Sequence, residues 1–114
     1  MNIKLENVVR FAVILTLSSM ALGAHAADKD GAKLFEEKRC YICHEMKTVS
    51  LGPPLIAVAA RHAPRKDIMG EVLARKIVQG GGGNWGVVPM VPNQWVSMDE
   101  ARVLADWILT MKVE

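Results

Sequence analysis

Two cysteines and a histidine form the group in the sequence with the most evident chemistry. They occur together as Cys40-Tyr41-Ile42-Cys43-His44. At this spacing, one helical turn brings the two thiols to the two vinyl groups on one edge of a porphyrin, and each thiol can form a thioether there. The histidine that follows then projects toward the iron as an axial ligand. The motif predicts one covalent haem c on Cys40 and Cys43, with His44 bound to the iron.

Three other interpretations of this group remain open. A Cys-x-x-Cys pair also suits a thiol–disulfide enzyme, although such a pair belongs to a βαβ setting and the sequence contains no strand pattern. A structural zinc site needs four ligands, and the available set is Cys40, Cys43, His44 and His62. Two inert cysteines are the third interpretation. The haem interpretation is favoured because the chain also begins with an export signal, and haem c is attached outside the cytoplasm.

The second axial ligand must come from another part of the chain. The methionines that follow the signal are Met46, Met69, Met90, Met98 and Met111. Met46 is too close to His44 to reach the opposite haem face, and three others fall on predicted helices, where methionine usually serves packing. Met90 lies in a loop between Pro89 and Pro92, and prolines restrict the backbone there. Exclusion therefore favours Met90.

Short helices joined by long loops must position these groups. Apolar spacing predicts helices over 30–39, 55–62 and 66–78, and a last helix from a capping box at Ser97 and Glu100 to about Lys112. In the third helix one buried stripe is expected, formed by Ile68, Val72, Leu73 and Ile77. In the last helix the expected apolar face is Ala101, Leu104, Ala105, Ile108 and Met111. No segment reads as a strand, so the predicted fold class is all-α with about four short helices.

The first 26 residues have the pattern of a secretory signal. Lys4 and Arg10 precede an apolar run over 11–22. Ala24 and Ala26, which follow the run, are the small residues that a signal peptidase reads. The apolar run of about 12 residues is shorter than the ~20 that a spanning helix needs. We therefore expect cleavage after Ala26, a periplasmic location, one domain over 27–114 and no stable membrane insertion.

The size and the net charge of the chain exclude several further classes of protein. A domain this small rarely buries a sufficient core without disulfides, a metal or a cofactor. Two cysteines in one turn cannot build a disulfide framework, whereas a haem would supply buried apolar surface. The chain has 14 Lys and Arg against 12 Asp and Glu. This near-neutral balance argues against a nucleic-acid or membrane-surface binder.

The sequence resembles the class I monohaem cytochromes c, and in particular the short bacterial c-551 type. Beside the haem motif, the resemblance is carried by Asn84-Trp85-Gly86, Val88-Pro89-Met90-Val91-Pro92-Asn93, Leu51-Gly52-Pro53, Ala59-Ala60, Ala74 to Ile77 and Ala105-Asp106-Trp107. These segments cover nearly all of 27–114. The resemblance implies the class I cytochrome c fold, in which helices and long loops wrap around one covalent haem and Phe35 packs near Trp107 between the first and last helices.

The resemblance also implies roles around the haem. Pro53 would accept a hydrogen bond from Nδ1 of His44, which fixes the histidine tautomer and strengthens its donation to the metal. Trp85 would bind a haem propionate. Lys76 falls where the family often has an arginine, which is the better bidentate partner. Asn93 would support the loop that carries Met90, although Gln94-Trp95 makes the segment after it one residue longer than usual.

These assignments predict an electron carrier and not an enzyme. Two axial ligands leave no open iron position, so single electrons pass with little change of ligand geometry. The resemblance implies a monomer that docks transiently, with a membrane cytochrome complex as donor and a nitrite reductase, terminal oxidase or peroxidase as acceptor. The apolar residues Val49, Leu51, Val88 and Val91 are expected to rim the exposed haem edge. The alternative is a haem sensor or ligand-binding module in which Met90 is labile.

Overall fold

The structure, a computed structural model, describes residues 22–112, with side chains from residue 30 onward. Its helices are α2 (Leu22–Glu37), α3 (Leu55–His62), α4 (Lys66–Gln79) and α5 (Met98–Thr110), with 3₁₀ turns η1 (Cys40–Ile42) and η2 (Ala63–Arg65). Within the described residues the only β-type pairing is an isolated bridge between Gly81 and Met90. The all-α prediction is confirmed.

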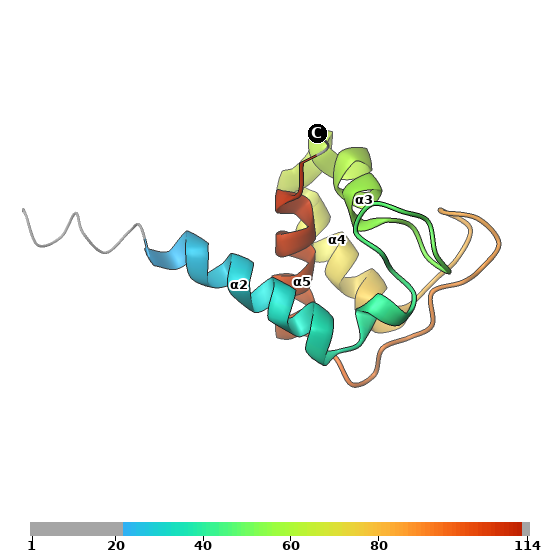
Figure 1. The fold of residues 1–114 in the computed structure, drawn as a ribbon, viewed down its shortest axis with the longest axis horizontal. Coiled ribbons are helices and arrows are strands. Elements are labelled where there is room, and N and C mark those ends of the chain that lie inside the picture. The colour runs from blue at the N-terminus through green and yellow to red at the C-terminus, as the bar shows by residue number, and fades with distance from the viewer. Residues whose placement is uncertain (1–21, 113–114) are drawn as a thin grey trace, which may run out of the picture.

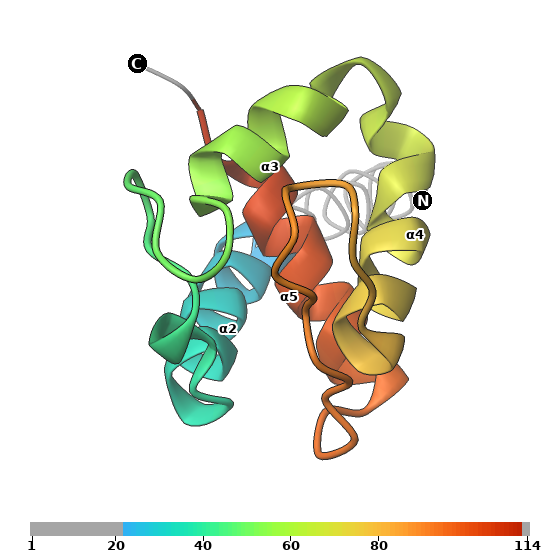
Figure 2. The same cartoon turned by 90° about the vertical axis from the view of Figure 1, so that its right-hand side faces the viewer.

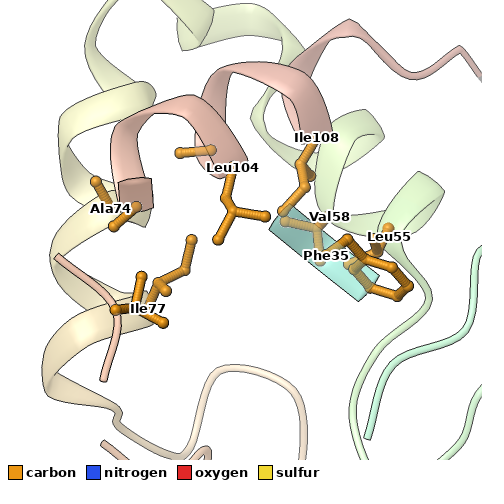
Figure 3. Close-up of a cluster of buried hydrophobic side chains, with 10 residues drawn as sticks. Phe35, Leu55, Val58, Ala74, Ile77, Leu104 and Ile108 are labelled. Carbon is orange, nitrogen blue, oxygen red and sulfur yellow. The ribbon is translucent and has the colours of Figure 1, made fainter. Parts of the chain in front are cut away.

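Helix α5 is the centre of the fold. Helices α2, α3 and α4 all pack against it, and Figure 1 shows it between α2 and α4. The buried cluster that results is Phe35, Leu55, Val58, Ala74, Ile77, Val96, Ala101, Leu104, Ala105 and Ile108. Figure 3 shows members of this cluster from α2, α3, α4 and α5 around one region, with Leu104 near its middle. None of the described polar or charged residues is buried.

The contact between α2 and α5 agrees with the expectation from the sequence. The ring centroids of Phe35 and Trp107 lie 5.6 Å apart with the rings tilted by 51°, which is a favourable aromatic arrangement. Gly31 lies directly against the Trp107 side chain, where a methyl group would have no space. The first and last helices therefore cross closely at this point.

The ends of α2 differ from the prediction. The helix ends at Glu37, two residues earlier than expected, because Arg39 adopts the left-handed conformation with φ of 59° and turns the chain away. It begins at Leu22, so the predicted cut after Ala26 falls inside it and stays a prediction. The rest of the predicted signal lies outside the described residues. No helix in the described part of the chain is long and apolar enough to span a membrane.

Helix α3 has the predicted bounds, whereas the predicted buried stripe of α4 is correct only in part. Ile77 is buried and Leu73 packs against the buried cluster, as predicted. Ile68 and Val72 are 53% and 43% exposed, and Met69 and Ala74 are buried in their place. The reason is that α4 approaches α5 through small residues, with Gly70 close to the Asp106 carboxylate. A side chain as large as Ile or Val would keep the two helices apart at this crossing.

The start of α5 confirms the predicted capping box. The Ser97 hydroxyl accepts a hydrogen bond from the Glu100 amide at 3.1 Å, and the Glu100 carboxylate accepts one from the Ser97 amide at 2.9 Å. Lys38, just after α2, forms an ion pair with Glu100 at 2.9 Å. The helix ends at Thr110 because the backbone of Met111 is extended. This ion pair thus ties the end of α2 to the beginning of α5.

Candidate functional site

The cysteine motif lies on a tight turn that begins where α2 ends. The amides of Cys43 and His44 both donate to the Cys40 carbonyl, at 3.2 and 3.0 Å. Both cysteines are free and half-buried, and Cys40 packs against the buried cluster. The turn thus places two thiols and one imidazole beside the apolar core.

The structure does not favour the dithiol or zinc alternatives. Burial raises the pKa of the Cys40 thiol, and the nearby Cys43 adds to that effect. A thiol–disulfide enzyme needs the opposite, since its attacking cysteine is activated by a lowered pKa. Among residues 22–112, no three His, Cys, Asp or Glu side chains come together as a metal site of their own. His62 is thus not grouped with Cys40, Cys43 and His44.

The His44 ring is fixed by the segment that follows the turn. Its Nδ1 lies 2.9 Å from the Pro53 carbonyl oxygen, and a carbonyl can only accept, so Nδ1 carries the proton. The Gly52 amide also donates to the Cys43 carbonyl at 2.7 Å. A Cβ on Gly52 would lie 2.6 Å from Cε1 of His44, so only glycine allows this approach. The arrangement leaves Nε2 of His44 as the nitrogen that can bind a metal.

Met90 is held at the base of a closed loop over residues 81–90, which we call the methionine loop. Gly81 and Met90 exchange two backbone hydrogen bonds, of 2.9 and 2.7 Å. Gly80, just before the loop, has φ of 71°, and a Cβ there would collide with the backbone of Met90 and lie 2.8 Å from the Pro92 nitrogen. The end of α4 and the end of the methionine loop are therefore in direct backbone contact.

Asn93 joins the methionine loop to the last turn of α4. Its side-chain amide donates to the carbonyls of Ile77 at 2.8 Å and Val91 at 3.2 Å. Its backbone amide donates to the Val78 carbonyl at 3.1 Å. These carbonyls of α4 have no partner within the helix, and Asn93 supplies one. This is the supporting position that the resemblance assigned to Asn93.

Trp85 lies at the tip of the methionine loop, whereas Lys76 belongs to α4 and lies beside the base of the loop. Trp85 is at its tip, 42% exposed, and its ring lies under the guanidinium of Arg61, whose Cζ is 4.9 Å from the ring centroid. Lys76 is at the base, with Nζ 2.9 Å from the position of a Cβ on Gly81. The contact with Arg61 was not predicted, because no sequence pattern relates the end of α3 to residue 85.

The two long loops lie on one side of the molecule. Figure 2 shows the segment between η1 and α3 on one side of α5 and the methionine loop in front of α5. Exposed apolar side chains line both loops: Val49 and Leu51 lie on the first, Val88 lies on the second and Val91 just after it, each 57–80% exposed. Met90, like Cys40, packs against the buried cluster. One apolar region is therefore bordered by both predicted attachment groups.

Comparison with known proteins decides what this arrangement is. A family profile described as Cytochrome c matches residues 29–112. The chain belongs to the cytochrome c family. It is 44% identical to cytochrome c-552 of Nitrosomonas europaea over 82% of this chain and 86% of the relative. It is also 44% identical to cytochrome c-551 of Azotobacter vinelandii, over 72% of this chain and 98% of the relative.

A solved structure agrees with the family assignment. The crystal structure of wild-type Nitrosomonas europaea cytochrome c552 superposes with a TM-score of 0.68 at 44% identity, covering 71% of this chain and 99% of that one. The present cytochrome c is therefore of the c-551 type, with the class I fold. Like its relatives it has one covalent haem c and carries electrons.

The residues of this cytochrome c fit that haem. Two thiols stand on one turn beside the buried cluster, the Nε2 of His44 is free to bind a metal, and the thioether of Met90 borders the same cluster. The exposed valines and leucine of the two loops offer apolar surface to a porphyrin. When bound, the haem supplies an iron that accepts and releases one electron. The chain supplies attachment, fixed ligand orientation and an apolar surrounding.

Proposed function

We propose that this cytochrome c is an exported, periplasmic carrier of single electrons whose haem is attached to Cys40 and Cys43 and ligated by His44 and Met90. The observation that carries the proposal is that both proposed ligands are fixed by backbone contacts: the Pro53 carbonyl holds the His44 ring, and the bridge to Gly81 holds the backbone of Met90. Ligands held in this way change position little between two iron oxidation states.

The surroundings of the ligands support electron transfer rather than substrate chemistry. Pro53 orients His44 and increases its electron donation, and histidine–methionine ligation raises the reduction potential. Trp85 and Lys76 are proposed to contact the haem propionates, and Asn93 keeps the methionine loop on α4. A sixth ligand held this firmly favours the carrier over the sensor.

Donor and acceptor are proposed to dock on the apolar rim formed by Val49, Leu51, Val88 and Val91. These side chains are exposed, and a small apolar contact suits the brief encounters of redox proteins. By analogy with the c-551 type, the donor is a membrane cytochrome complex and the acceptor a nitrite reductase, terminal oxidase or peroxidase. Export is proposed from the N-terminal signal, with a chain that begins at Ala27 as its expected product.

Replacing Met90 by leucine tests the ligand assignment, because leucine keeps the volume and removes the sulfur. The matched control is Met98→Leu, since Met98 also packs against the buried cluster but belongs to α5. We expect the ferric wild type and the control to have the sulfur-to-iron absorption band, and Met90→Leu to lose it and bind carbon monoxide when reduced. A wild-type protein that binds carbon monoxide at once and has no such band would support the sensor alternative instead.

A further inference from the structure

The methionine loop is closed at its base, and few contacts with the rest of the chain hold its tip. Gly81 and Met90 hold the base with two backbone hydrogen bonds. Residues 82–89 are all exposed, and Val87 is 98% exposed. Because so little of this tip is buried against the chain, each specific contact with another element contributes much of its support. What holds the tip therefore matters for the residue at the base.

One side chain from α3 makes two different contacts with this tip. Nη1 of Arg61 donates to the Asn84 carbonyl at 2.9 Å, and its guanidinium lies over the Trp85 ring at 4.9 Å. Figure 2 shows the methionine loop extending along α5 until its tip lies beneath α3. A planar guanidinium can donate in its plane and stack through its face at the same time, which an ammonium cannot.

Arg61 is itself well placed to act as an anchor. It belongs to the last turn of α3, and α3 is fixed by the buried side chains of Leu55, Val58 and Ala59. The contact therefore connects the tip to a helix that belongs to the core. The same loop ends at Met90, so any movement that carries Met90 away from the haem must also move the segment that Arg61 holds.

We propose that Arg61 is a positioning residue that clamps the tip of the methionine loop to α3 and thereby slows the displacement of the Met90 sulfur from the iron. The inference rests on the proposed ligation by Met90. Arg61 thus affects ligand exchange through its contacts with Asn84 and Trp85, and not through contact with the iron.

The test compares Arg61→Ala, Arg61→Lys and the control Arg65→Ala in the full holoprotein. Arg65 has the same charge and is exposed, and among residues 22–112 no hydrogen bond joins it to the methionine loop. Two quantities are measured in each variant. One is the rate at which imidazole replaces the sixth ligand of the ferric protein. The other is the hydrogen-exchange rate of the Gly81 and Met90 amides in the reduced protein.

Loss of the clamp should raise both rates by roughly 5- to 30-fold in Arg61→Ala, as expected for one hydrogen bond and one cation–π contact. Arg61→Lys should fall between Arg61→Ala and the wild type, and Arg65→Ala should stay within about twofold of the wild type. Equal rates in Arg61→Ala and Arg65→Ala would overturn the proposal. The exchange measurement needs no iron–sulfur bond, so it tests the clamp even if the ferric wild type lacks the sulfur-to-iron band and Met90 is not the ligand.

Discussion

Replacing Gly80 by alanine should disturb the methionine loop more than any other single methyl group added near it. Gly80 has φ of 71° and ψ of −167°, a combination that is essentially restricted to glycine and costs other residues about 1–3 kcal/mol. The added Cβ would also meet the backbone of Met90 and Pro92 rather than a flexible side chain. The loop base must therefore move to accommodate it.

The cost of the backbone conformation and the cost of packing the added Cβ can be estimated separately. Overpacking against atoms that cannot give way costs about 1–3 kcal/mol, so the total loss of stability for Gly80→Ala is about 2–6 kcal/mol. A domain of this size has roughly 5–15 kcal/mol in all. The variant should thus fold weakly, with Met90 displaced from its position in part of the population.

Gly83→Ala is the matched control. Gly83 also has a positive φ, of 86°, but a Cβ there would have no atom within 4 Å. It should lose only the backbone part, about 1–3 kcal/mol. Urea unfolding followed by far-ultraviolet circular dichroism gives both losses, and the sulfur-to-iron band of the ferric protein reports on Met90. Equal destabilisation by the two alanines, with the band intact in both, would refute the close backbone packing at Gly80.

Three further perturbations follow from the contacts around α4 and α5. Asn93→Ala should cost about 1–3 kcal/mol, because it removes two hydrogen bonds and leaves the Ile77 carbonyl without a partner; urea unfolding measures it, and a stability equal to the wild type would contradict it. Ser97→Ala should cost about 1 kcal/mol through loss of the helix cap, and an unchanged urea midpoint would argue against the cap. The hydrogen bond from the Ser97 amide lowers the pKa of the Glu100 carboxyl, and the contact with Lys38 lowers this pKa further. The contribution of the Glu100 carboxylate to the free energy of unfolding is therefore complete above the ordinary glutamate pKa, and it is lost as the pH falls through the lowered pKa. Glu100→Gln should reduce this pH dependence of the free energy of unfolding.

Local sequence signals predicted much of the fold. Helix α3 was predicted with its observed bounds, since Pro54 and Pro64 flank an apolar segment, and the Ser97 capping box marked the start of α5. The stripe of α4 was wrong at Ile68 and Val72, because apolarity ranked them above Gly70 and Ala74, whereas the crossing with α5 selects small residues at these points. The preference for small residues arises only where two helices cross, so the sequence of one helix alone does not reveal it.

The site was predictable where chemistry depends on spacing along the chain. Cys40, Cys43 and His44 lie in one motif, and Met90 stood out among the methionines because prolines flank it. Arg61 could not be found in this way, since its partners Asn84 and Trp85 are near it only once the chain has folded and the tip of the methionine loop lies against α3. Contacts between an exposed side chain and a distant loop carry no periodic signal in the sequence.

The most direct test of the account is the intact mass of the exported protein under denaturing conditions, recorded before and after treatment with a thiol-alkylating reagent. The account predicts a chain that begins at Ala27 and carries the added mass of one haem, with no alkylation at Cys40 or Cys43. A protein without the haem mass that takes up two alkyl groups would contradict the covalent attachment on which the ligand assignments depend.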